Sequence, residues 1–205
     1  MPADWMPPAD TRALIFDCDG TLADTMPIHY KAWVQILPPL GIPFGEERFY
    51  SLGGMPTGTI IRLLSGETGV VVGDVDALVL RKEEIFLTML HTVEPLAGIV
   101  GIAERYRGKL PMAVASGGYR SVVTKTLAAI GILDWFDALV CAEDTSKHKP
   151  EPDVFLEAAR RLGNVPPEAC VVFEDTDIGL EAARRAGMLG VDVRKWAPVR
   201  MGSSW

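Results

Sequence analysis

The chain has little cysteine, no block of basic residues and no long apolar run, and each shortage excludes a class of protein. Its 205 residues include three cysteines, Cys18, Cys141 and Cys170, too few and too widely spaced for a disulfide framework or a zinc site. The net charge of −7 argues against a nucleic-acid-binding surface. No apolar stretch approaches the roughly 20 residues that span a bilayer, and no secretory signal opens the chain. We therefore expect a cytoplasmic protein without nucleic-acid or membrane partners.

Short runs rich in Val, Ile, Leu and Ala predict a parallel sheet. The predicted buried strands are residues 12–17, 112–116, 138–142, 170–174 and 189–193. Helical patterns lie between the later ones, at residues 119–130, 153–162 and 178–186. Strand alternating with helix indicates an α/β fold whose sheet is covered on both faces. Because ligands of such sheets bind beyond the carboxyl ends of the strands, the residues just after each run are the candidates for a site.

The stretch from about residue 24 to 92 breaks this rhythm. It contains helical patterns at residues 28–37, 58–64 and 74–90 and no convincing buried strand. We interpret residues 25–92 as a helical cap inserted after the first strand, with residues 1–24 and 93–205 forming the catalytic core. Residues 196–205 carry no pattern and are expected to form a loosely packed tail.

Two carboxylates follow the first predicted strand, in the segment Asp17-Cys18-Asp19-Gly20-Thr21. Residues two apart in an extended segment point to the same face. Burying a charge is costly unless it is paired, so Asp17 and Asp19 together require a cation. The pair favours a metal-assisted site in which Asp17 is the nucleophile and Asp19 the acid/base. The alternative is a strand end followed by an acidic turn, because Asp-Gly is a common turn signal.

Two further segments suit a phosphoryl group. Ser116 and Gly117 end a predicted strand and open a helix, so a hydroxyl and backbone N–H groups could form an anion site there. A plain loop with a helix cap fits the same residues. Lys149, followed by Pro150-Glu151-Pro152, could supply a positive charge from a rigid loop. A lone lysine is, however, most often a solvated surface residue.

Glu174 and Asp175 follow the fourth predicted strand. Asp175 would complete an oxygen-rich Mg²⁺ site with Asp17 and the backbone carbonyl of Asp19. Taken alone, the acidic pair fits a solvated helix cap better. With Asp17 and Asp19 at a neighbouring strand end, the metal site becomes the favoured interpretation, and Mg²⁺ and Lys149 would make a dianionic ligand tolerable.

These motifs, in this order, resemble those of the haloacid dehalogenase superfamily. The matching residues are Asp17-Cys18-Asp19-Gly20-Thr21, Ser116, Lys149-Pro150-Glu151-Pro152-Asp153 and Glu174-Asp175-Thr176. Within the superfamily the chain is similar to the beta-phosphoglucomutase-like group, and most of all to bacterial phosphatases acting on fructose 1-phosphate and similar esters. The resemblance implies a Rossmann-like core, Mg²⁺ and an aspartyl-phosphate intermediate on Asp17. It also implies that Ser116 and Lys149 hold the phosphoryl group, with Glu174 as a metal ligand or its neighbour.

The resemblance extends to the cap. Residues in the positions of the mutase's hinge and substrate contacts are Thr25, His29, Trp33 and Lys82. Helix packing would explain His29 and Trp33 equally well. Thr57 stands where the mutase has an arginine for its second phosphate, and Tyr119 where it has a basic residue, which favours hydrolysis.

We therefore expect a monomeric phosphatase acting on a small phosphorylated metabolite. A phosphosugar mutase is the first alternative. A phosphate-sensing or partner-binding protein that has lost catalysis is the second, although no chemical position of the motifs is missing.

Overall fold

The computed structural model describes residues 5–196, and residues 1–4 and 197–205 lie outside this description. The predicted tail, residues 196–205, therefore falls outside it except for Trp196. That residue ends a 3₁₀-helix, Val193–Trp196.

The core is a five-stranded parallel sheet in the order β3-β2-β1-β4-β5. The strands are β1 (Ala13–Phe16), β2 (Met112–Ala115), β3 (Ala138–Val140), β4 (Cys170–Glu174) and β5 (Leu189–Asp192). Strand β1 is central and pairs with β2 on one side and β4 on the other. The strand order reverses between β1 and β4, which is where a parallel sheet opens a crevice at its carboxyl edge. The predicted α/β fold is confirmed.

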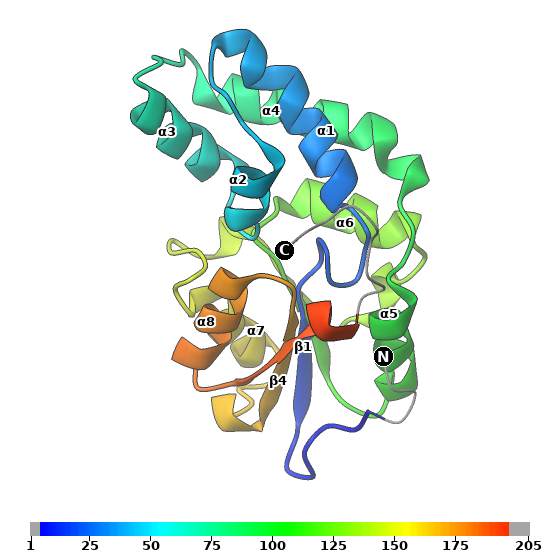
Figure 1. Ribbon diagram of the computed structural model, residues 1–205. Helices are drawn as coiled ribbons and strands as arrows, with labels where there is room; N and C mark the ends of the chain where they lie inside the picture. The colour runs from blue at the N-terminus through cyan, green and yellow to red at the C-terminus, as the bar shows by residue number, and fades with distance from the viewer. Residues whose placement is uncertain (1–4, 197–205) are drawn as a thin grey trace.

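The side chains of β1 point alternately into two separate apolar layers, one on each face of the sheet. Ala13 and Ile15 pack into the layer under α7 (Asp153–Arg161) and α8 (Asp177–Arg185). Leu14 and Phe16 pack into the layer under α5 (Ala97–Tyr106) and α6 (Arg120–Ala129). Figure 1 shows helices on both sides of the sheet. All four residues of β1 are buried, which explains why its sequence is a continuous apolar run with no polar residues in alternation.

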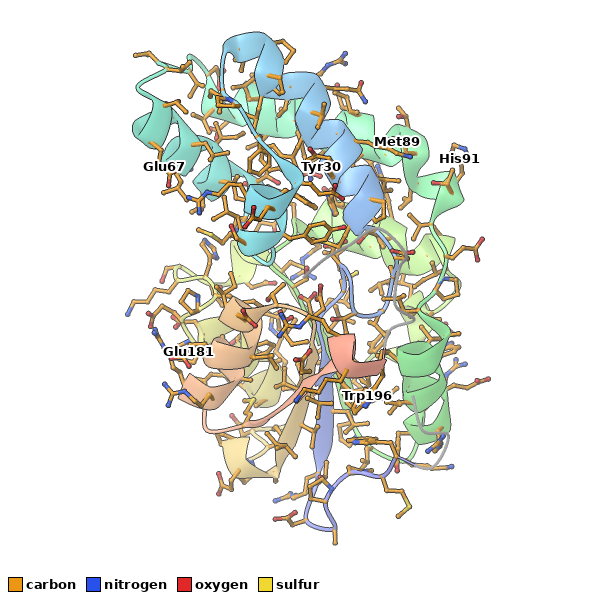
Figure 2. The ribbon with its side chains drawn as sticks, viewed as in Figure 1. Tyr30, Glu67, Met89, His91, Glu181 and Trp196 are labelled. Carbon is orange, nitrogen blue, oxygen red and sulfur yellow. The ribbon has the colours of Figure 1, made fainter. Side chains whose placement is uncertain are left out.

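Helices α7 and α8 end in the same six residues, Leu-Glu-Ala-Ala-Arg-Arg, and use them in the same way. In α8 the buried Ala182 and Ala183 face the sheet, while Glu181 accepts hydrogen bonds from Arg184 and Arg185 on the outer side. Figure 2 shows Glu181 on this outer face. Small residues on one face and spaced charge pairs on the other explain why this sequence packs closely on a sheet.

Four helices lie over the carboxyl ends of the strands (Figure 1). They are α1 (Met26–Ile36), α2 (Glu46–Ser51), α3 (Thr57–Thr68) and α4 (Val75–Met89). Their apolar side chains form a cluster of their own, and Tyr30, labelled in Figure 2, packs on Phe49 with ring centroids 5.4 Å apart. The chain leaves and re-enters the core side by side, since Asp24 N–H donates to the Glu94 carbonyl at 3.0 Å.

Several boundaries differ from the sequence predictions. Helices α2 and α5 were not predicted. Strand β3 is shorter than residues 138–142, because the Asp144 carboxylate accepts from the Cys141 N–H at 2.7 Å and the chain turns into a 3₁₀-helix, Ala142–Asp144. Strand β5 was predicted to be buried, but it lies at the sheet edge and Leu189 is 47% exposed. An edge strand has only one neighbour, so its apolar sequence does not ensure burial.

Candidate active site

The first element of the site is a buried lysine between two carboxylates. Lys149 Nζ donates to Asp17 Oδ1 at 2.7 Å and to Glu174 Oε1 at 2.9 Å, and all three side chains are almost completely buried. Asp17 directly follows β1 and Glu174 ends β4, so the pairing of these strands brings the carboxylates together. Burial lowers the pKa of Lys149, but the two carboxylates outweigh it and the pKa is raised. Lys149 is thus a fixed positive charge beside Asp17.

Three carboxylates surround this position. Oxygens of Asp17, Glu174 and Asp175 lie within 4.8 Å of one another. Burial raises the pKa of Asp17 to about 7; Lys149 opposes the change, and the charges of Glu174 and Asp19 add to it. Burial and the neighbouring carboxylates also raise the pKa of Asp175. One lysine therefore leaves the cluster short of positive charge. A hard divalent cation fits a donor set made only of oxygen atoms.

Gly20 allows the first motif to approach the acidic pair. Its φ of +79° lies in the left-handed region, and a Cβ there would come within 2.2 Å of Asp175 Oδ2. The next residue, Thr21, donates its hydroxyl proton to Asp175 Oδ1 at 3.0 Å. The turn after the two aspartates thus both breaks the strand and fixes Asp175.

Glu174 is held by more donors than Asp175. Besides Lys149, it accepts from the Thr176 backbone N–H at 2.7 Å and from the Thr176 hydroxyl at 3.1 Å. Thr176 is also the N-cap of α8, where its hydroxyl accepts from the Gly179 N–H. The Glu174 carboxylate is consequently tied to both the lysine and the start of α8.

The side chain of Asp19 binds to the helical segment instead of this cluster. Its Oδ1 accepts from the Thr25 hydroxyl at 2.7 Å and contacts His29 Nε2 at 3.1 Å. Burial by itself raises the pKa of Asp19, but His29, Thr25 and Lys82 outweigh it and bring the pKa to about 2. Asp19 is therefore an ionised hydrogen-bond acceptor in this structure.

The contacts continue from His29 into α4. Lys82 Nζ lies 2.7 Å from His29 Nδ1, and because an ammonium can only donate, His29 accepts there and donates to Asp19 through Nε2–H. Lys82 also donates to both oxygens of Glu83, at 3.2 and 3.3 Å. Thr57 donates to Glu83 Oε1 at 2.6 Å. Burial lowers the pKa of Lys82, while Glu83 opposes the change.

The structure thus brings most of the predicted cap residues to one cavity. His29, Trp33, Thr57 and Lys82 line the same cavity as Asp17, Asp19, Ser116 and Gly117. Trp33 is 2% exposed and also packs edge-on against Phe44, so it serves the helical core as well. Thr25 reaches the site only through Asp19.

Ser116 and Gly117 line the cavity from the loop that follows β2. Ser116 is buried, and its hydroxyl accepts from the Gly118 N–H at 3.0 Å. Gly117 lies so close to the loop between α2 and α3 that a Cβ there would come within 2.2 Å of the Gly54 carbonyl oxygen. The loop after β2 therefore touches the helical segment directly.

Glu83 is a charged lining residue that the sequence did not indicate. It sits beside Lys82 on α4, and its neighbour Glu84 is exposed. No local pattern distinguishes the two glutamates, and a helical-wheel comparison with Val79 and Phe86, which are buried, would have been the available signal.

The comparison with protein families agrees with the motifs. Residues 11–187 match the model of the haloacid dehalogenase-like hydrolases. The chain belongs to this family. Among curated relatives, the fructose-1-phosphate phosphatase YqaB of Escherichia coli (strain K12) is 43% identical over 182 residues, which are 88% of this chain and 95% of that protein. The beta-phosphoglucomutase of Bacillus subtilis (strain 168) is 30% identical over 196 residues, covering 92% of this chain and 85% of that enzyme.

The solved structures agree with the fold. The crystal structure of a beta-phosphoglucomutase from Clostridium difficile has a TM-score of 0.82 to this chain at 25% identity, and the match covers 89% of this chain and 84% of that one. Family and relatives together identify the chain as a hydrolase of phosphoric monoesters, which confirms the predicted enzyme class. Among residues 5–196, no helix is long and apolar enough to cross a membrane.

Proposed function

We propose that the protein is a Mg²⁺-dependent phosphatase that hydrolyses small sugar-phosphate monoesters. The observation that carries the proposal is Asp17, buried beside Lys149 and two further carboxylates and opening onto a cavity that also contains Asp19. The 43% identical relative, whose name specifies fructose 1-phosphate, supports the substrate class. Residues 25–92 would form the cap that closes over the substrate. A cytoplasmic location and a monomeric state remain predictions.

In the first step, an Asp17 carboxylate oxygen would attack phosphorus while the bond from phosphorus to the sugar oxygen breaks. Asp19 would give a proton to the leaving oxygen. Its low pKa belongs to the free enzyme, and a phosphate dianion placed beside it would raise that pKa. In the second step, Asp19 would take a proton from water as the water attacks the phosphoaspartate, which releases phosphate and restores Asp17.

The remaining residues would hold charge in place. Lys149 and the Ser116 hydroxyl would bind the non-reacting phosphoryl oxygens, together with the Gly117 backbone. Asp17, Asp175 and the Asp19 carbonyl would hold Mg²⁺, with Glu174 as a further ligand or as the anchor of Lys149. The ion would supply charge neutralisation for the phosphoryl group and would return Asp17 to its ionised form.

The described residues that the predicted cap contributes to the cavity favour hydrolysis over the mutase reaction, because they offer no free cation for a second phosphate. A mutase must hold a bisphosphate and release it reversed. Among the described lining residues, the only cation at that end is Lys82, which is already bound to Glu83.

The test is phosphate release from a panel of sugar phosphates, with Mg²⁺ and with excess EDTA. We expect Mg²⁺-dependent release from the wild type and at least a thousandfold loss in Asp17→Asn, because an amide cannot replace the nucleophile. Asp10→Asn, which removes an exposed carboxylate just before the amino end of β1, at the end of the strand opposite to Asp17, is the matched control and should keep full activity.

Four results would contradict parts of the proposal. Turnover by Asp17→Asn would exclude the covalent mechanism, and full activity in EDTA would exclude the metal. Glucose 6-phosphate formed from beta-glucose 1-phosphate without free phosphate would indicate a mutase. A folded protein that releases phosphate from no ester would indicate a non-catalytic role.

A further inference from the structure

We propose that Glu83 makes the cavity selective for an uncharged, hydroxyl-rich leaving group and excludes substrates that carry a second phosphate or a carboxylate. This inference rests on the proposed phosphatase function and specifies the substrates of that same site.

Glu83 faces the cavity that the reacting groups share. It lines the cavity together with Asp17 and Asp19, and its side chain is only 12% exposed. A chain of contacts links it to the acid/base: Asp19 to His29, His29 to Lys82, and Lys82 to Glu83. Because Asp17 and Glu83 line the same cavity, a substrate whose phosphoryl group lies against Asp17 would extend its other end toward Glu83.

The charge of Lys82 is not available to a second anion. Its ammonium donates to both Glu83 oxygens and to His29, and it lies 5.5 Å from the Trp33 ring centroid and 5.4 Å from the Phe86 ring centroid. Lys82 is the only lysine or arginine among the described residues that line this cavity. Arg62 approaches from outside, near Gly58, but it is exposed and lies 3.9 Å from Asp76.

Tyr119 lines the same cavity as Glu83. Burial and, next to it, the Glu83 charge raise the pKa of the Tyr119 hydroxyl. A second phosphate in this space would meet a carboxylate in a partly dehydrated cavity, where like charges repel strongly.

Glu83 can still accept hydrogen bonds from a neutral substrate. Its Oε1 accepts from Thr57 and Lys82, whereas Oε2 accepts, among the described residues, from Lys82 alone at 3.3 Å. A carboxylate oxygen has room for a further donor, and a sugar hydroxyl is such a donor. The same residue thus attracts hydroxyl groups and repels anions.

The experiment compares kcat/KM for fructose 1-phosphate and fructose 1,6-bisphosphate in the Mg²⁺-loaded wild type and in Glu83→Gln. We expect the wild type to prefer the monophosphate, and Glu83→Gln to raise kcat/KM for the bisphosphate at least about tenfold, since removing a like charge from such a cavity is worth at least that factor. Glu83→Asp keeps the charge and should keep the discrimination. Glu84→Gln removes one charge from the exposed side of α4 and should change kcat/KM for neither ester.

The inference would be overturned if Glu83→Gln left the ratio of the two kcat/KM values unchanged. It would also be overturned if Glu84→Gln changed that ratio as much as Glu83→Gln does. Measuring the binding of both esters by calorimetry tests the role of Glu83 even if the proposed function is wrong. If neither ester is hydrolysed by the wild type, the proposed function fails. Stronger binding of the bisphosphate to Glu83→Gln than to the wild type would still support the role of Glu83, and unchanged binding would exclude it.

Discussion

Thr126 is a buried residue of α6 whose hydroxyl, among the described residues, has no hydrogen-bond partner. A buried polar group without a partner loses its hydration with no compensation. Thr126→Val keeps the branched shape and removes the hydroxyl. We expect it to raise the free energy of unfolding by about 1 kcal/mol, measured by urea denaturation.

Thr124, on the same helix and half-buried, provides the comparison. Thr124→Val should leave the free energy of unfolding within about 0.5 kcal/mol of the wild type. If Thr126→Val proves destabilising, the hydroxyl has a partner, and the explanation by an unsatisfied group is wrong.

At the scale of the element, α4 positions both Lys82 and Glu83 and begins at a defined cap. The Asp74 carboxylate accepts from the Ala77 N–H at 3.0 Å, which satisfies one of the free donors of the first turn. Asp74→Ala should lower the free energy of unfolding by about 1 kcal/mol. Because α4 is also held by apolar packing against α1 and α3, kcat/KM should change less than twofold.

Asp76 lies in the first turn of the same helix without capping it, so Asp76→Ala is the control. It removes a similar favourable interaction with the helix dipole and an exposed contact with Arg62, but no cap hydrogen bond, so it should lower the free energy of unfolding by about 0.5 kcal/mol or less. Equal losses in the two variants would show that charge, and not the cap, stabilises the start of α4.

At the scale of the whole molecule, the site is complete only where the helical segment meets the sheet. Gly117 and the Gly54 carbonyl are in close contact across this boundary, and a Cβ at residue 117 would overlap the carbonyl oxygen. Gly117→Ala should therefore push the two parts away from each other. We expect kcat/KM for the sugar phosphate to fall at least about tenfold.

Gly66→Ala is the control, since a Cβ there meets nothing within 4 Å. Small-angle scattering on both variants, with and without Mg²⁺ and phosphate, shows whether the separation of the parts has changed. Wild-type activity in Gly117→Ala would contradict the close contact. We also expect the cap to open and close during turnover, with hinges near residues 24–25 and 93–94, and the same scattering measurements test this.

The residues of the site differ in how far the sequence could predict them. Asp17 and Asp19 were indicated by their place after a buried strand, because an unpaired charge there needs a reason. The sequence alone gave only weak evidence for Lys149. Its burial shows only in the structure, where Lys149 contacts Asp17 and Glu174, 132 and 25 residues away along the chain. Glu83 belongs to no motif. Its helical-wheel position beside Val79 and Phe86 indicates the buried face of α4, but only the tertiary structure shows that this face borders the cavity.

The sequence by itself determined the parallel sheet, the order of its motifs and the family, because apolar runs and the polar residues directly after them are local properties of the chain. It also indicated a helical insertion after the first strand. Only the tertiary structure decided that β5 is exposed at an edge, that Asp19 is held by Thr25 and His29, and that Glu83 borders the cavity. Each of these depends on contacts between segments distant in the chain, which local pattern does not encode.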